Sequence, residues 1–137
     1  MNKYTFLSLI IIIFSCGCGD KNLIMSGNGD YEYKISNQWS IFRNNTFDIM
    51  IGKSNGSLPY TPGKMKIGPL FEYSLNGDLI FGKHYGQKKR NLFKNDELLE
   101  SDSKIIVVVE INTLTESVKI INDLTILPNN LKWIPIP

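Results

Sequence analysis

The chain has 137 residues, with 15 Lys and Arg, 13 Asp and Glu, one His and a formal net charge of +2. This length allows one compact domain. The proportions of hydrophobic residues (42%) and charged residues (20%) are those of a globular protein rather than a disordered one. A net charge this close to zero does not point to a polyanionic partner, so we expect no nucleic-acid binding.

The chain begins with a short basic head followed by an apolar run. Lys3 is the one charged residue in the head, and residues 4–14 are apolar apart from Thr5 and Ser8. A helix that crosses a bilayer needs about 20 apolar residues, and this run is much shorter. The pattern therefore predicts a secretory signal peptide, with an uncleaved anchor as an alternative.

The end of the apolar run resembles the lipobox of bacterial lipoproteins. Ile13-Phe14-Ser15-Cys16 has an aliphatic residue, a tolerant position, a small residue and then cysteine. The resemblance implies a signal peptide over residues 1–15 and a diacylglycerol thioether on Cys16. Cys18 fits a looser form of the same pattern, but its third preceding residue is Ser15 rather than an aliphatic residue.

The spacing of the two cysteines does not favour a thiol site. A redox pair usually reads Cys-x-x-Cys, and a zinc site needs further ligands. After residue 20 the chain has no cysteine, and its one histidine is His84. We therefore expect no metal site, no cofactor and no disulfide, and a lipid-anchored protein on the extracytoplasmic side of a bacterial cell membrane.

Residues 16–29 are predicted to be the lipidated N-terminus and a flexible tether, because they are polar and rich in glycine. Residues 30–137 are predicted to form one β-rich domain. Apolar and polar residues alternate in Asp30–Ser36 and again in Trp39–Arg43, which is the pattern of half-buried strands. Further strands are predicted over residues 46–53, 71–75, 79–84, 104–111 and 116–122.

The turn signals between these segments suggest how the strands connect. Asn76-Gly77 is a favoured dipeptide for a two-residue hairpin turn. Residues 52–69 hold several glycines and prolines and predict a loop or a poorly paired edge strand. The hydrophilic residues 85–103 predict either a solvated excursion or a short helix near Leu92–Leu99. The fold class is therefore mainly β, a small antiparallel sandwich or barrel-like domain, with α+β as the alternative if that helix forms.

Few residues suggest chemistry. His84 follows Lys83 near the end of a predicted strand, with no accompanying serine or cysteine motif, and a surface or strand-end position is favoured. The acidic residues lack the alternating ligand positions and central glycine of a calcium loop, so a solvated face is expected; they are Asp96, Glu97, Glu100 and Asp102.

Two further groups of side chains allow alternative interpretations. The basic run Lys88-Lys89-Arg90 could touch anionic lipid headgroups, although a solvated loop tip is favoured. Alternating aromatic residues could form a binding face, but on strands such residues more often lie in the core. They are Tyr31, Tyr33, Trp39, Phe71 and Tyr73.

Several segments together are similar to the small bacterial lipoproteins grouped as DUF3997. The similarity lies in Gly29-Asp30-Tyr31, Trp39–Arg43, Ile80–His84 and Glu110–Thr113. It ends at the C-terminus, where the family tends to carry a Gly-Pro-Leu segment and a helix. The family has no assigned activity, so the resemblance implies a location and no catalytic residue.

These observations predict a non-enzymatic binding or interaction role at the cell envelope. The partner would be a protein or an envelope ligand of unspecified type, and a toxin-neutralising, immunity-type lipoprotein is one form of this prediction. The alternative is an envelope-acting hydrolase that uses His84. That alternative needs a pocket in which His84 meets a carboxylate or a hydroxyl group.

Overall fold

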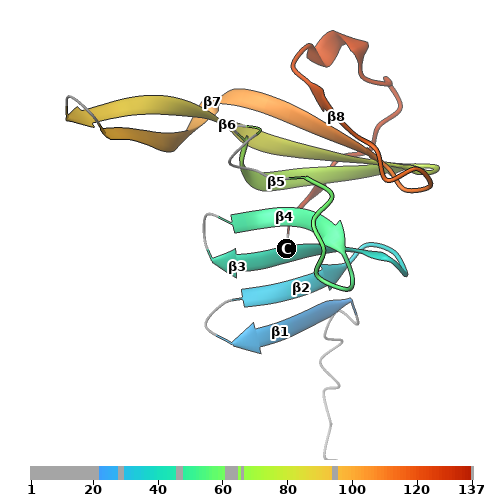
Figure 1. The fold of residues 1–137 in the computed structure, drawn as a ribbon. Helices are drawn as coiled ribbons and strands as arrows, with labels where there is room; N and C mark the ends of the chain where they lie inside the picture. The colour runs from blue at the N-terminus through green and yellow to red at the C-terminus, as the bar shows by residue number, and fades with distance from the viewer. Residues whose placement is uncertain are drawn as a thin grey trace, which may run out of the picture.

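The computed structural model describes residues 22–27, 30–45, 48–60, 65, 67–93 and 96–136. The predicted signal peptide, Cys16 and Cys18 lie outside these residues. Within them the chain forms two antiparallel sheets, as predicted, and the fold is a small β-sandwich (Figure 1). No helix among the described residues is long and apolar enough to cross a membrane.

The first sheet is a four-stranded meander with the order β1-β2-β3-β4. Its strands are β1 (Leu23–Gly27), β2 (Asp30–Lys34), β3 (Trp39–Asn45) and β4 (Asp48–Lys53). Each strand pairs with the next in sequence, so short turns are sufficient to connect them.

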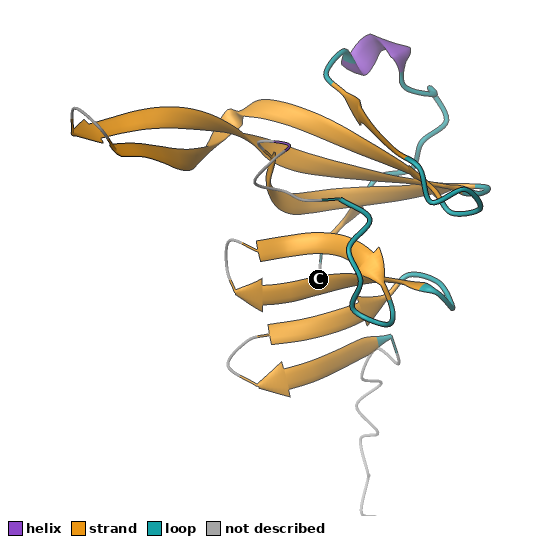
Figure 2. Cartoon of the chain, viewed as in Figure 1, coloured by secondary structure: helices purple, strands orange, loops and turns teal. Residues whose placement is uncertain are grey.

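The second sheet has the order β8-β7-β6-β5-β9. Its strands are β5 (Ile67–Asn76), β6 (Leu79–Phe93), β7 (Asp96–Asn112), β8 (Val118–Ile121) and β9 (Ile134–Pro135). A single 3-10 turn, η1 (Leu124–Ile126), lies between β8 and β9 (Figure 2). The chain passes from one sheet to the other only between β4 and β5.

The main core lies between the two sheets, because alternate residues of each strand point inward. Trp39, Ile41 and Ile51 come from the first sheet, and Ile80 and Val109 from the second. The alternation predicted for Trp39–Arg43 is confirmed for Trp39 and Ile41, which both point into the main core. On β7 the residue that points away from this core, Val108, is not exposed but also fully buried.

A second core covers the outer face of the second sheet. Phe81, Val108 and Ile121 form its centre, and the chain after β8 packs over them through Leu127, Leu131 and Trp133. The chain then reaches the far edge of the sheet, where Ile134 pairs with Tyr73 on β5. The second sheet is therefore covered on both faces at β7, which explains why the consecutive residues Val107, Val108 and Val109 are all buried.

Three predicted elements differ from the structure. Residues 23–27, assigned to the flexible tether, form β1 and pair with β2, so the sheet begins before Asp30. The hairpin turn consists of Gly77 and Asp78, one position later than predicted, with Asn76 paired to Leu79. Gly77 has φ +58°, and Asp78 is not among the positive-φ residues, which is the pattern of a type II′ turn.

The third difference is the hydrophilic segment over residues 85–103. It forms no helix near Leu92–Leu99, because its described residues continue β6 and β7 as a long hairpin. We call residues 87–101 the arm. In Figure 1 the arm extends well beyond the two sheets. The predicted solvated excursion therefore exists as a two-stranded ribbon.

Candidate functional site

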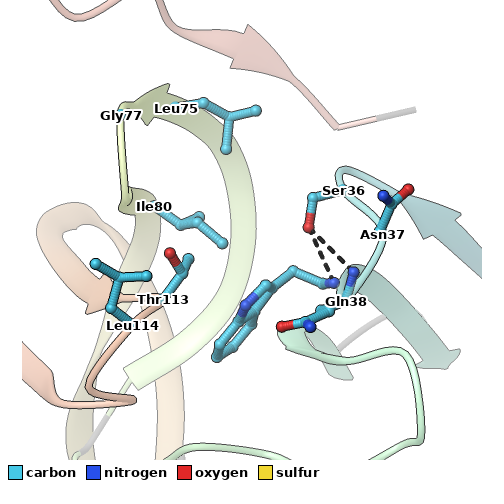
Figure 3. A pocket seen from close by; sticks show the side chains of 9 residues that line it. Ser36, Asn37, Gln38, Leu75, Gly77, Ile80, Thr113 and Leu114 are labelled. Carbon is cyan, nitrogen blue, oxygen red and sulfur yellow. Dashed lines mark hydrogen bonds between the residues drawn. The ribbon is translucent and has the colours of Figure 1, made fainter.

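One end of the sandwich carries a pocket of about 390 Å³, which we call the end pocket. Turns from distant parts of the sequence surround it, and Figure 3 shows the β2–β3 turn facing residues of the second sheet across it. The lining residues are Ser36, Asn37, Gln38, Trp39, Leu75, Gly77, Ile80, Thr113 and Leu114.

The β2–β3 turn forms the polar wall of the end pocket. The Ser36 hydroxyl oxygen accepts hydrogen bonds from the backbone N–H groups of Gln38 and Trp39, at 3.3 and 3.1 Å. This local bonding is typical of serine in turns, and the Ser54 backbone N–H after β4 also donates to the Gln38 carbonyl oxygen at 2.9 Å. As a result, the Asn37 and Gln38 side chains stay exposed to solvent.

The opposite wall is built by two turns that hydrogen bond to each other. The Asp78 carbonyl oxygen, in the β5–β6 turn, accepts from the Thr113 backbone N–H at 2.8 Å and from the Thr113 hydroxyl at 2.9 Å. Asn112 Oδ1 accepts from the N–H groups of Leu114 and Thr115 at 3.0 Å each. These bonds hold the β7–β8 turn in place.

Two leucines are exposed on this wall despite their apolar character. Leu114 is 74% exposed and Leu75 is 46% exposed. Both line the end pocket, and behind them lies Ile80, which belongs to the main core. A surface leucine on its own needs no explanation, but two that line the same wall of one pocket, Leu75 at the end of β5 and Leu114 in the β7–β8 turn, form a preorganised apolar contact.

A second hollow of about 410 Å³ adjoins the end pocket and shares Asn37 and Gln38 with it. We call it the polar hollow, since its other lining residues are Lys53, Ser54, Asn55 and Glu116. Lys53 on β4 forms an ion pair with Glu116 in the β7–β8 turn, which links the two sheets at this end.

This arrangement provides binding chemistry of two kinds. The leucines offer an apolar surface, and the carboxamides of Asn37 and Gln38 each present both donors and acceptors. Because those two residues lie between the hollows, one ligand could contact both kinds of surface. The described residues include no group of three or more His, Cys, Asp or Glu side chains that could hold a metal ion.

The structure corrects the predicted position of His84. Its side chain is 0% exposed and lies inside the sandwich, rather than at the surface or at a strand end. The Nδ1 atom lies 2.9 Å from the Gly68 carbonyl oxygen. Since a carbonyl oxygen only accepts, Nδ1 carries the proton and Nε2 is left as an acceptor.

The second polar partner of the His84 ring is Tyr60, in the segment after β4. Nε2 faces the Tyr60 hydroxyl at 3.5 Å, and that hydroxyl accepts a hydrogen bond from the Ile51 backbone N–H at 3.0 Å. Burial lowers the pKa of His84 to about 4, so the ring is neutral at neutral pH. Burial likewise raises the pKa of the Tyr60 hydroxyl.

The other predicted candidates lie away from the end pocket. Asp102 accepts from the Lys104 backbone N–H at 3.0 Å and pairs with Lys88 at 3.1 Å. These contacts hold the pKa of the Asp102 carboxyl below its usual range. Glu100 is half-buried on β7. The side chains of Lys89, Arg90, Asp96 and Glu97 lie outside the described part of the structure.

The predicted aromatic residues mainly build the core. Tyr31, Trp39 and Tyr73 are buried in the main core, and Tyr33 packs against it. Phe71 stacks on Tyr85, with ring centroids 4.4 Å apart. The core interpretation is therefore confirmed for Tyr31, Tyr33, Trp39 and Tyr73, whereas Phe71 is half-buried and belongs to neither core cluster.

Sequence reasoning did not find the end pocket. Its two walls come from segments about 40 residues or more apart, and only the pairing of the turns brings them together. The chain matches no protein-family model, no curated protein and no solved structure. The resemblance to the DUF3997 lipoproteins therefore stays a prediction.

Proposed function

We propose that the protein is a lipid-anchored binding protein of the bacterial cell envelope, and that it binds its partner at the turn-bearing end of the sandwich. The observation that carries this proposal is the pair of exposed leucines, Leu75 and Leu114, on the second-sheet wall of the end pocket. A preformed concave site with apolar side chains and a few polar groups is the usual form of a binding site.

The surrounding geometry supports the same proposal. Three side-chain acceptors hold the turns: Ser36 Oγ, Asn112 Oδ1 and, further out, Asn55 Oδ1, which accepts from the Ser57 backbone N–H at 3.0 Å. Turns fixed in this way lose little conformational freedom on binding. Asn37 and Gln38 would then add hydrogen bonds at the rim of the contact.

The burial of His84 gives no support to the hydrolase alternative. A general base must reach the proton that it removes, and both ring nitrogens of His84 face groups inside the sandwich. A toxin-neutralising lipoprotein is a special case of the binding proposal. It would use the same end of the sandwich with a protein toxin as the partner.

The binding proposal can be tested with matched leucine variants. Native protein, Leu75→Ser/Leu114→Ser and Leu124→Ser would each be immobilised and exposed to solubilised envelope fractions. Leu124 is 40% exposed on η1 and lines neither hollow, so it controls for loss of an exposed leucine. We expect a component that is captured by the native protein and by Leu124→Ser, and that is lost with the double variant. Equal capture by all three proteins would contradict the proposed site.

The anchor can be tested separately by intact mass and membrane fractionation of the native protein. A mass that begins at Cys16 and includes a diacylglyceryl group is expected. Cys16→Ser should release the protein from the membrane fraction, while Cys18→Ser should leave it there. Retention of Cys16→Ser in the membrane fraction together with release of Cys18→Ser would show that Cys18 carries the lipid.

A further inference from the structure

The contact between the two sheets contains a buried chain of polar groups. It runs from the Ile51 N–H on β4 to the Tyr60 hydroxyl, then to His84 Nε2 on β6, and from His84 Nδ1–H to the Gly68 carbonyl on β5. The first link joins Tyr60 to an edge strand of the first sheet, the second joins Tyr60 to the second sheet, and the third lies within the second sheet. We call these four groups the polar joint.

The polar joint is consistent only with a neutral imidazole. Nδ1 donates to Gly68, so Nε2 must accept, and the Tyr60 hydroxyl can donate to it while accepting from Ile51. If Nε2 gained a proton, it would become a second donor directed at the Tyr60 oxygen. The hydroxyl proton would then have no acceptor within the joint, and a positive charge would be buried.

Among the residues that the structure describes, no charged side chain compensates that charge. Tyr60 is the titratable side chain that faces the ring, and it comes from the segment after β4. Apolar side chains also lie close by: Leu70 Cδ1, Ile51 Cδ1 and His84 Nε2 all lie within 3.2 Å of the place that a Cβ at Gly82 would take, and Val107 on β7 is the register partner of His84. Burial lowers the pKa of His84 and the Gly68 carbonyl opposes this effect, and no charged side chain of the described residues contributes.

Tyr60 also anchors a segment that borders the candidate site. The chain from Ser54 to Tyr60 folds back on β4, where Lys53 N–H donates to the Ser57 carbonyl at 2.8 Å. Gly52 leaves room for this segment, because a Cβ there would lie 2.9 Å from Leu58 Cδ2. Ser54 and Asn55 at its start line the polar hollow.

We propose that His84 makes the polar joint acid-sensitive: protonation of Nε2 releases Tyr60, and with it the segment from Ser54 to Tyr60, while the sheets themselves stay paired. The effect on ligand binding rests on the proposed function, but the opening of the joint does not. Acid would thus act on the border of the polar hollow from inside the fold.

The test uses the native protein and two local reporters of hydrogen exchange. The Ile51 amide donates to Tyr60, so its protection reports the joint. The Thr113 amide donates to the Asp78 carbonyl at the end pocket and serves as the reference. Between pH 7 and pH 5, we expect the protection factor of Ile51 to fall about twentyfold, by linkage to His84, and that of Thr113 to stay unchanged.

Two variants and one titration complete the test. His84→Gln should remove the pH dependence at Ile51, and Tyr60→Phe should leave that amide poorly protected at every pH. The chain has a single histidine, so its imidazole resonance can be titrated in the native protein without any variant. An Ile51 protection factor that does not change with pH would overturn the proposal. Equal protection factors for the Ile51 amide and the central Val109 amide at pH 5 would also overturn it, since opening would then be global. A His84 resonance that titrates at or above pH 6.5 would overturn it as well.

Discussion

At Gly82 on β6 the core leaves little room for a side chain. A Cβ at this position would lie 2.8 Å from Leu70 Cδ1 and 2.9 Å from Ile51 Cδ1. Leu70 belongs to the same sheet, whereas Ile51 reaches across from β4 in the other sheet. The absence of a side chain at Gly82 is therefore part of the core packing, although φ at this residue is ordinary.

Gly82→Ala should lower the free energy of unfolding by about 1–3 kcal/mol, the usual cost of overpacking a core. Denaturant unfolding of the variant would measure it. Ile51→Val removes the Cδ1 that a new methyl group would meet, so the double variant should lose less than the sum of the two single variants. Additive losses would mean that Ile51 does not limit the space at Gly82.

At the residue scale, the sequence held a signal for the burial of His84. Alternation along β6 puts His84 on the face of Ile80 and Gly82, whereas Lys83 shares the face of Phe81. The neighbouring lysine and the expected strand end suggested the surface instead. The partners of the ring could not be predicted, because Gly68 and Tyr60 reach it from a bulged strand and from a loop.

At the element scale, the arm contributes little to the described core. Between Tyr85 and Ile106, none of the side chains that the structure describes (residues 86–88 and 100–105) belongs to either core cluster. The pairing from Gln87–Ser101 to Phe93–Asp96 extends the hairpin by seven residues on β6, or about 20 Å. A bulge separates the arm from the sheet, since Tyr85 pairs with Ile106 but Gly86 pairs with Asp102.

Replacing residues 89–99 by Asn-Gly should leave the free energy of unfolding within about 1 kcal/mol of the native value, because an isolated two-stranded ribbon is marginally stable by itself. The new turn would follow Lys88 and precede Glu100, which are register partners. Denaturant unfolding would measure the effect. A loss of several kcal/mol would show that the arm supports the sandwich.

Unlike the arm, the C-terminal segment contributes to a core, because it covers the outer face of the second sheet. Trp133 packs on the cluster of Phe81, Val108 and Ile121, and its ring lies 3.9 Å from Lys83 Nζ. Lys83 also pairs with Glu72 at 2.7 Å. Trp133 thus closes the outer face of the second sheet over both apolar and charged neighbours.

Trp133→Ala should destabilise the protein by about 2–4 kcal/mol, since it removes a large, partly buried aromatic side chain from a packed face. Ile126→Ala is the matched control, because Ile126 is exposed on η1 and should change stability by less than about 0.5 kcal/mol. Thermal unfolding followed by circular dichroism would compare the two. Equal shifts in Tm would contradict the role of Trp133.

The elements that could be predicted were those with clean alternation or a preceding turn signal. The strand at Asp30–Lys34 was found because apolar and polar residues alternate within it, and the one at Val118–Ile121 because a turn signal precedes a short apolar segment. The arm was missed because its charges suggested a solvated segment, and the register that sets Lys88 against Glu100 is a property of pairing. β1 was missed because its pairing with β2 outweighs the poor strand propensity of its glycine-rich surroundings.

At the scale of the whole molecule, His84 makes stability depend on pH. Its pKa is about 4 in the folded protein and about 6.5 in the unfolded chain, so between these values the unfolded state binds more protons. Stability is therefore fully present above about pH 6.5 and decreases as the pH falls toward 4, by up to about 3 kcal/mol. Urea unfolding at pH 7 and pH 4.5 would measure this, and His84→Gln should show a smaller difference.

The fold class followed from the sequence because strand period and turn residues are local signals. The candidate site did not, because it consists of turns that meet only after both sheets have formed. The Asp78 carbonyl that receives Thr113 lies 35 positions away in the chain. The Lys53–Glu116 ion pair spans 63 positions. Local sequence patterns do not predict contacts between residues so far apart in the chain.

The projecting arm is a suitable place to divide this domain into two fragments that can reassemble. A single cut at its tip would leave one piece with the whole first sheet, β5 and β6, and another with β7, β8 and β9. The two pieces would still meet along the β6–β7 ladder, through both cores and at the β5–β9 edge. Fragment complementation could therefore report on this fold without disturbing the end of the sandwich that carries the pocket.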